Sequence, residues 1–228
     1  MSRVPPPRTE AELLAGATSI GGLTLAELAH TLGSAIPSDS TRAKGWSGEL
    51  LEAALGAAGT SEPEPDFPNL GIELKTVPIS PNGRSKESTH VCVVPLEPQP
   101  GLRWEDSLVC RKLARVLFVP LLSPPNETLG ERVVCAPLLW SPTSIQAAKL
   151  RRDWEELMEY IAFGRAHELT AHQGDWLQIR PKAANARSTG WTSDPAGRRV
   201  PTNPRGFYLR SSFTTELLKS HFILPGNG

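Results

Sequence analysis

Apolar residues along this chain follow two periods, one typical of helices and one typical of strands. In the longest helical stretch, Leu150, Trp154 and Leu157 recur every three or four residues and therefore share one face. Two shorter stretches begin with a Thr that is followed three residues later by a Glu, the signature of a capping box at a helix N-terminus. These signals predict helices at Thr9–Ile20, Thr24–Leu32, Lys44–Ala58, Asp106–Leu113, Thr143–Glu168 and Ser212–Leu224.

Runs of apolar and β-branched residues between Gly, Pro and Ser predict the strands. Pro81-Asn82-Gly83 is a strong turn signal between the first two runs, so these should be two strands around a turn. The last two runs should pair as a hairpin around a long loop at Ala183–Pro204, which lacks periodicity. Helices around these strands indicate a mixed α/β fold with a largely antiparallel sheet. The predicted strands are Gly71–Ile79, Thr89–Leu96, Val116–Leu122, Arg132–Trp140, Trp176–Lys182 and Gly206–Arg210.

The composition is that of an ordinary globular protein of 228 residues, with 24 basic and 24 acidic residues. This neutral total hides an uneven distribution, because residues 1–70 carry four Lys or Arg against nine Asp or Glu. Between Arg180 and Arg210 the balance reverses, with seven basic residues and one acid, Asp194. We therefore expect a negatively charged partner to bind this basic segment.

The three cysteines, Cys92, Cys110 and Cys135, form no Cys-x-x-Cys pair. Isolated cysteines in odd number are typical of a reduced cytosolic protein and argue against a zinc ribbon or a secreted disulfide scaffold. The N-terminus has no apolar signal core, and no apolar run approaches the roughly 20 residues that a membrane-spanning helix needs. The sequence therefore predicts a soluble, cytoplasmic protein with no membrane partner.

The stretch from Asp66 to Lys75 carries the candidate chemistry. Alternate residues of a strand share a face, so Glu73 and Lys75 should point the same way, and Asp66 at the strand entry could fold back towards them. Two carboxylates and an ammonium at one point suit metal-assisted phosphodiester cleavage, because carboxylates hold Mg²⁺ and the ammonium stabilises the attacking hydroxide. Glu52, near the apolar face of a predicted helix, is a candidate further ligand. These residues would equally suit a solvated strand face with a salt bridge.

The basic segment contains a second candidate site. Arg180 and Lys182 end one predicted strand, Asn185 follows them, and Tyr208 lies on the next strand. Arg and Lys can bind guanine acceptors or phosphates, Asn can pair with adenine, and Tyr can press on a base edge. The alternative is a basic solvated loop with Tyr208 in the core.

Longer motifs occur in order along most of the chain, and together they resemble one family. The motifs are Lys44-Gly45-Trp46, Leu50-Leu51-Glu52, Asp66 with Glu73-Leu74-Lys75-Thr76, Pro137-Leu138-Leu139-Trp140-Ser141-Pro142, Asp153-Trp154-Glu155-Glu156-Leu157-Met158, Gln178-Ile179-Arg180-Pro181-Lys182-Ala183-Ala184-Asn185-Ala186 and Arg205-Gly206-Phe207-Tyr208-Leu209. They resemble the MutH family, the strand-discriminating endonucleases of methyl-directed DNA mismatch repair and relatives of type II restriction enzymes.

The resemblance implies a restriction-endonuclease-like fold, in which a central mixed sheet is flanked by helices. A single domain of two lobes would form a clamp around a DNA cleft, with residues 1–142 mainly catalytic and residues 143–228 mainly DNA-reading. One departure from the family is Ala114, which stands where the family tends to carry a further Lys after Lys112.

The resemblance also implies roles for the matching residues. Asp66, Glu73 and the Leu74 carbonyl would bind Mg²⁺, whose site Mn²⁺ or Ca²⁺ could also occupy, and Glu52 would serve a second metal. Lys75 would activate the attacking water, and Lys112 would assist at the phosphate. The implied DNA contacts are Lys44, Arg180, Pro181, Lys182, Asn185 and Tyr208, of which Tyr208 would sense the adenine methyl group.

The implied activity is nicking of the unmethylated strand of double-stranded DNA at hemimethylated GATC sites. MutL would activate the enzyme after MutS finds a mismatch, and we expect a monomer. Two alternatives stay open at this point. One is a restriction-type endonuclease that cuts both strands of a GATC-like site, and the other is a non-catalytic DNA-binding module.

Overall fold

Strand β3 (Val116–Leu122) lies at the centre of the first of two units into which the chain divides. The structure is a computed structural model that describes residues 4–38, 45–58, 63–182 and 190–222. The first unit takes in Met1–Glu87, Ala114–Ser141 and Thr214–Gly228, and the second takes in Ser88–Leu113 and Pro142–Phe213. Both units are discontinuous in sequence, unlike the lobes predicted at 1–142 and 143–228, and the roles assigned to those lobes stay predictions.

The sheet of the first unit contains both parallel and antiparallel pairs. Strand β3 pairs in parallel with β1 (Glu73–Ile79), with Glu73 opposite Val116. On its other side, β3 pairs antiparallel with β4 (Val133–Val134) and β5 (Leu138–Trp140). All but the last residue of β3 are buried, which is why its sequence is continuously apolar. The predicted mixed sheet is confirmed.

One strand predicted in this unit is wrong. The single strand predicted at Arg132–Trp140 is two short strands, because Pro137 between them has no N–H to donate to a ladder. The two strands predicted on either side of Pro81-Asn82-Gly83 are present, as β1 in this sheet and as β2 (Thr89–Val93) in the sheet of the second unit. The turn itself is present, and the Gly83 N–H donates to the Ser80 carbonyl at 2.8 Å.

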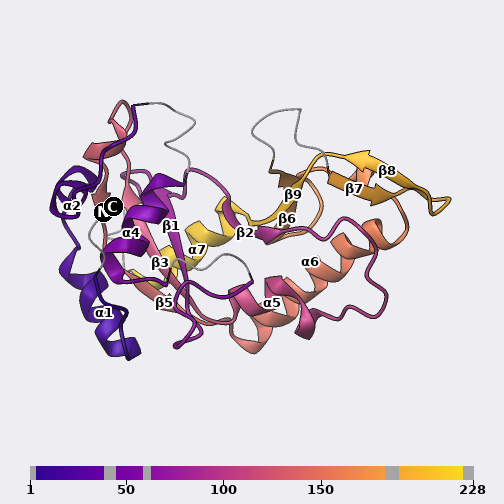
Figure 1. Cartoon of the computed structure of the whole chain (residues 1–228), viewed down its shortest axis with the longest axis horizontal. Coiled ribbons are helices and arrows are strands. Elements are labelled where there is room, and N and C mark those ends of the chain that lie inside the picture. Colours follow the sequence, from indigo (N-terminus) through magenta and orange to yellow (C-terminus); the bar gives the residue numbers. More distant parts are fainter. Residues whose placement is uncertain (1–3, 39–44, 59–62, 183–189, 223–228) are drawn as a thin grey trace. The chain divides into compact units, whose positions relative to one another are not determined.

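Helices α1 (Glu10–Ser19), α2 (Leu25–Thr31) and α4 (Trp46–Leu55) share one apolar core with this sheet (Figure 1). Leu50 and Leu51 of α4 are fully buried in that core. Burying these side chains stabilises α4 more than its intrinsic helix propensity does, because most helical stability in proteins comes from packing. The α4 backbone is thereby fixed beside β1, where the candidate carboxylates lie.

The predicted capping boxes are present in full at one helix and in half at the other. At α2 the Thr24 hydroxyl accepts from the Glu27 N–H, and the Glu27 carboxylate accepts from the Thr24 N–H. At α1 the Thr9 hydroxyl accepts from the Glu12 N–H, but the Glu12 carboxylate accepts from the Arg8 N–H instead. Both helices therefore begin where the sequence predicts.

The sheet of the second unit has the order β2-β9-β6, and all its pairs are antiparallel. These strands are β2 (Thr89–Val93), β9 (Arg205–Leu209) and β6 (Leu177–Pro181). The β6–β9 pair confirms the predicted hairpin. Strands β7 (Gly190–Ser193) and β8 (Arg199–Thr202) form a further two-stranded sheet within the predicted loop Ala183–Pro204, whose residues 183–189 lie outside the described chain.

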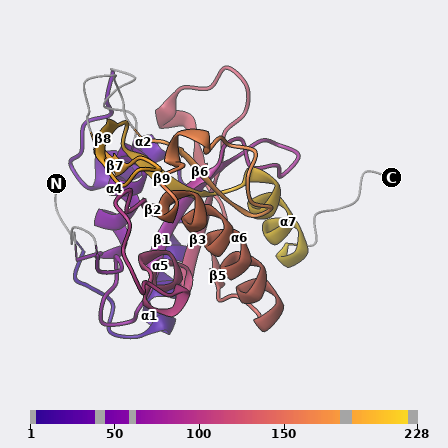
Figure 2. The same cartoon turned by 90° about the vertical axis from the view of Figure 1, so that its right-hand side faces the viewer.

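Helix α6 (Ser144–Ala162) contacts β6, and the two lie side by side in Figures 1 and 2. The buried carboxylate of Asp153 on α6 accepts the N–H groups of Asp175, Trp176 and Leu177 at 3.0, 2.6 and 2.9 Å. An ionised acceptor of three backbone donors makes charge-assisted hydrogen bonds, which are the strong class. This carboxylate fixes where β6 begins.

The predicted end of α6 at Glu168 is wrong, because the helix stops before Gly164. That glycine has φ of 70°, and a Cβ at this position would overlap the backbone of Asp194. Only glycine accepts both conditions, so the chain leaves the helix there and forms a single 3₁₀ turn at Ala166–Glu168.

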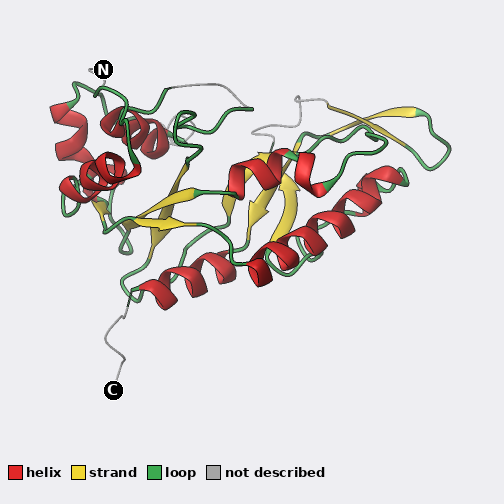
Figure 3. Ribbon diagram, turned by 90° about the horizontal axis from the view of Figure 1, so that it is seen from below, coloured by secondary structure: helices red, strands yellow, loops and turns green. Residues whose placement is uncertain are grey.

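The remaining described elements are two 3₁₀ turns and two α-helices. A 3₁₀ turn at Trp104–Asp106 leads into α5 (Leu108–Leu113), a second 3₁₀ turn spans Leu129–Glu131, and α7 covers Ser211–His221. Figure 3 distinguishes helices from strands along the described chain, and the predicted mixed α/β class is confirmed. None of the described helices is long and apolar enough to cross a membrane.

Candidate functional site

The first candidate site is a carboxylate cluster, which we define as Glu52, Asp66 and Glu73 together with Lys75. The Lys75 ammonium lies 2.7 Å from Glu73 Oε1, so these two side chains share one face of β1, as the strand period predicts. The Glu73 side chain is 4 % exposed and that of Lys75 is 15 % exposed. An ion pair so well shielded from water holds both groups in place more firmly than a solvated pair would.

Asp66 folds back onto the same strand from the preceding turn. Its Oδ2 accepts the Leu74 N–H at 2.8 Å, which fixes the carboxylate at the entry of β1. The turn is closed by reciprocal backbone hydrogen bonds between Phe67 and Ile72. The Asp66 carbonyl also accepts the Ala58 N–H, which ties the turn to the segment after α4.

Glu52 completes the cluster from α4. Burial raises the pKa of the Glu52 carboxyl group, the Asp66 carboxylate raises it further, and the Lys75 ammonium opposes them by lowering it. Glu49 and Glu73 also raise this pKa. The cluster therefore holds more negative charge than Lys75 neutralises, a condition that a bound cation relieves.

The donor set fits a hard divalent cation. Such ions bind carboxylate and carbonyl oxygens, and Asp66, Glu73 and the Leu74 backbone supply these types within nine residues of sequence. Within the described chain, no three His, Cys, Asp or Glu side chains are grouped so that they could hold a metal together. A site here would therefore use two carboxylates and a carbonyl, with Glu52 as an outer carboxylate.

Lys112 lies in the second unit, on α5, and is 4 % exposed. A lysine so deeply buried is rare unless its charge is paired. The sequence alone gave no indication that Lys112 would be buried. Lys44 and Asn185, two of the predicted DNA contacts, lie outside the described residues.

The second candidate site is the Tyr208 face, which we define as the side chains of Ser88, His90, Gln178, Arg180 and Tyr208. Tyr208 on β9 lies between His90 and Gln178, which are its partners on β2 and β6. The His90 and Tyr208 rings form a T-shaped pair with centroids 5.1 Å apart, and the Arg180 guanidinium lies 6.0 Å from the Tyr208 ring. Arg180 is exposed and Tyr208 is half-buried.

Gly206 makes this arrangement possible. It is two residues before Tyr208 on the same face, and a Cβ there would lie 3.0 Å from both rings. Burial raises the pKa of the Tyr208 hydroxyl, and Arg180 opposes this effect. The phenol is therefore protonated at neutral pH and can donate a hydrogen bond. Pro181 and Lys182 are exposed at the end of β6.

Sequence reasoning did not single out Ser88, His90 or Gly206 as site residues. Strand alternation could have grouped Gln178 with Arg180, which are two residues apart. Ser88 is 90 residues from Gln178 along the chain, and only the pairing of β2, β9 and β6 brings it to this face.

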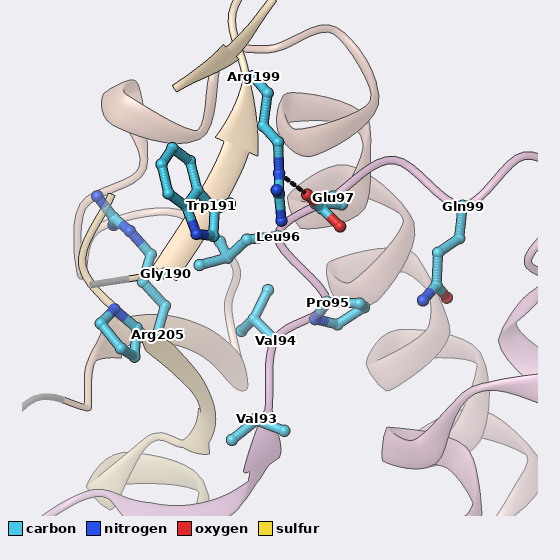
Figure 4. Close-up of a pocket in the computed structure, with 11 residues that line it drawn as sticks. Val93, Val94, Pro95, Leu96, Glu97, Gln99, Gly190, Trp191, Arg199 and Arg205 are labelled. Atoms are coloured by element: carbon cyan, nitrogen blue, oxygen red, sulfur yellow. Dashed lines mark hydrogen bonds and ion pairs between the residues drawn. The ribbon is translucent and has the colours of Figure 1, made fainter. Parts of the chain in front are cut away.

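A pocket of about 330 Å³ in the second unit was also missed (Figure 4). Trp191, 44 % exposed, stands at its edge with the Arg199 guanidinium 4.7 Å from its ring, and Arg199 is paired with Glu97 at 2.6 Å. The Thr192 hydroxyl donates to the Leu96 carbonyl and thereby joins the β7–β8 hairpin to the pocket wall. The pocket is lined by residues that include Val93, Pro95, Leu96, Gly190 and Arg205.

Comparison with known proteins gives consistent results. The family model described as DNA mismatch repair enzyme MutH matches residues 55–153. A DNA mismatch repair protein MutH of Shewanella sp. (strain MR-7) is 47% identical over 97% of this chain and 100% of its own length. Proteins of the same name from Escherichia coli strains 536 and K12 are 49% and 48% identical, over 96% of both chains in each case.

Proposed function

Because this chain belongs to the MutH family of DNA mismatch repair enzymes, we propose that it is the strand-discriminating endonuclease of that pathway. In this proposal it nicks the unmethylated strand of double-stranded DNA at hemimethylated GATC sites and depends on Mg²⁺. MutL would activate it once MutS has found a mismatch, and it would act as a cytoplasmic monomer. As a member of this family, the chain has a restriction-endonuclease-like fold.

The observation that carries this proposal is the carboxylate cluster. Asp66 and Glu73, with the Leu74 carbonyl, would hold Mg²⁺, and Glu52 would serve a second ion. A bound Mg²⁺ would neutralise charge on the phosphate and lower the pKa of water. The hydrogen bond from Leu74 to Asp66 and the ion pair from Lys75 to Glu73 orient both carboxylates before any ligand arrives. Preorganisation of this kind avoids the cost of reorienting charged groups during reaction.

Two lysines would act directly on the reacting groups. Lys75, held at 2.7 Å from Glu73, would donate to the attacking water and position it in line with the phosphorus. Lys112 would donate to a phosphate oxygen and stabilise the charge that develops in the transition state. Its burial supports this role, because a poorly hydrated ammonium interacts strongly with an anion.

The Tyr208 face would select the substrate. Arg180, Pro181 and Lys182 would enter the major groove, with Lys44 and Asn185 as further DNA contacts. Arg and Lys can bind guanine O6 and N7, and a half-buried Tyr hydroxyl can approach the N6 amino group of adenine. A methyl group on N6 would occupy the same space, so Tyr208 would distinguish the two strands.

A nicking assay on one GATC duplex in its hemimethylated, unmethylated and fully methylated forms tests the proposal, with and without MutL. We expect one nick in the unmethylated strand, stimulation by MutL, loss of activity in EDTA and its recovery with Mg²⁺. Efficient double-strand cleavage without MutL would instead identify a restriction-type enzyme.

Two variants separate catalysis from binding and discrimination. Asp66→Ala should abolish nicking while leaving DNA binding nearly intact, because it removes a carboxylate and no cationic contact. Nicking that survives this change would indicate that the assigned centre is wrong, and a wild-type protein that binds DNA without nicking would be a non-catalytic module. Tyr208→Phe should weaken discrimination by methylation state more than it lowers the rate on the preferred duplex.

A further inference from the structure

We propose that Ser88 is a specificity-positioning residue, which holds Arg180 on the Tyr208 face and directs its own hydroxyl hydrogen to an acceptor on a DNA base. This inference rests on the proposed function, since it assigns Ser88 to the same DNA-reading site. Neither the sequence motifs nor the family roles described above include this residue.

The argument starts from two hydrogen bonds that converge on one oxygen. Gln178 and Arg180 are two residues apart on β6 and share its face. Gln178 Nε2 donates to Ser88 Oγ at 2.7 Å, and Arg180 Nη1 donates to the same oxygen at 3.3 Å. Ser88 directly precedes β2, on the far side of β9, so its hydroxyl bridges the outer strands of this sheet.

The two donors, Gln178 and Arg180, differ in burial, and this difference determines which of them fixes the Ser88 hydroxyl and which is held by it. Gln178 is 4 % exposed, so its amide group cannot exchange Ser88 for water without an energetic penalty. Arg180 is exposed and its long side chain would otherwise sample many rotamers in solvent. The buried amide therefore fixes the hydroxyl, and the fixed hydroxyl limits the positions of the guanidinium. A side chain ordered before binding loses less entropy when it contacts a base.

The second part of the proposal, a hydrogen bond from Ser88 to a base, follows from the number of hydrogen bonds that a hydroxyl group can donate and accept. A serine hydroxyl has two acceptor lone pairs and one hydrogen to donate. Gln178 and Arg180 occupy the two acceptor positions, so the hydrogen must point elsewhere. Ser88 is half-buried and therefore still accessible to a ligand. An acceptor on a base edge, such as purine N7, guanine O6 or thymine O4, suits a donor beside a base-reading Arg.

The test is the ratio of binding to a GATC duplex and to a duplex of scrambled sequence, measured by fluorescence anisotropy in EDTA. Ser88→Ala should lower this ratio about tenfold, as expected for one lost base-directed hydrogen bond together with a less ordered Arg180. Ser88→Thr keeps the hydroxyl and should restore most of the preference. Ser85→Ala is the matched control, because the Ser85 hydroxyl bonds only the nearby Glu87 carbonyl among the described contacts.

Coupling to Arg180 separates a positioning role from a merely structural one. In the Arg180→Ala background the further change Ser88→Ala should lower the ratio by less than tenfold, because the positioning of Arg180 no longer contributes and only the hydrogen bond from Ser88 to the base is lost. An equal effect in both backgrounds, or an equal loss on both duplexes, would overturn the proposal. The melting temperature of each variant, measured in parallel, identifies any loss that comes from folding.

The outcomes also distinguish this inference from the proposed function. A wild-type protein with no preference for GATC would contradict the proposed function itself. A wild-type protein that prefers and nicks GATC, alongside a Ser88→Ala protein with the same preference, would contradict the role of Ser88 alone.

Discussion

Replacing Gly206 by Ala adds one methyl group under the paired rings of His90 and Tyr208. The added Cβ would lie 3.0 Å from His90 Cδ2, 3.0 Å from Tyr208 Cε2 and 3.1 Å from His90 Nε2. Carbon atoms pack best at roughly 3.5–4.0 Å, so the rings would have to withdraw by about half an ångström or more. We therefore expect Gly206→Ala to separate the two rings and to displace Tyr208 from its position on the face.

The energetic cost follows from two opposing terms. Overpacking typically costs about 1–3 kcal/mol. The loss of backbone freedom in the unfolded chain returns about 0.4–1 kcal/mol, because Gly206 is outside the positive-φ region and Ala can adopt its conformation. The net destabilisation should be about 1 kcal/mol, which lowers the melting temperature of a chain of this size by about 2–4 °C.

Two quantities are measured for each variant. One is the melting temperature, and the other is the ratio of the nicking rates on hemimethylated and fully methylated duplexes. Gly190→Ala is the matched control, because Gly190 also lies in a strand of the second unit but its Cβ would have only ordinary contacts, the nearest at 3.5 Å. We expect Gly206→Ala to lower the ratio of the two nicking rates and Gly190→Ala to leave it unchanged. Equal behaviour of the two variants in both measurements would refute the packing argument.

Three further predictions concern stability and charge. Asp66→Asn keeps an acceptor for the Leu74 N–H, so it should abolish nicking at a nearly unchanged melting temperature, whereas Asp66→Ala should also destabilise by about 1 kcal/mol. Asp153→Ala leaves three backbone donors without their acceptor and should cost about 3 kcal/mol, with Asp153→Asn less affected in the same thermal melt. Lys182→Ala should reduce the slope of log binding constant against log salt concentration by about one, and an unchanged slope would remove Lys182 from the DNA contacts.

The elements predicted correctly are those that local sequence determines. The run Val116–Leu122 is continuously apolar, and the structure has β3 over the same residues because both of its sides are covered. The Thr24 capping box is likewise contained within four residues. The alternation of Glu73 and Lys75 placed both on one face of β1, where the structure has them ion-paired. In each case the relevant contacts are close in sequence or follow from a simple period.

The errors arise where a distant segment decides the outcome. Helix α6 ends at Ala162, before Gly164, whose neighbour in space is the backbone of Asp194, and nothing within the helix signals that contact. The segment Ala183–Pro204 contains the β7–β8 hairpin, but each of its strands is only 4 residues long, too short for a period of two to stand out in the sequence. The partner of β1 is β3, reached through a long crossover that local turn chemistry at Asn82 could not reveal.

The passage of the chain between the two units limits how the protein can be cut into fragments or recombined with another. The backbone passes between the two units at residues 87–88, 113–114, 141–142 and 213–214, so neither unit is a contiguous piece of the gene. A fragment ending at residue 142 would contain β2 without β9, its only partner among the described strands. Because the Tyr208 face extends from Ser88 to Tyr208, recombination at a single point before Ser88 would transfer β3, β4 and β5 of the first unit along with it. The face proposed to choose the target is therefore inherited together with β3, the strand that pairs with β1 and its part of the carboxylate cluster.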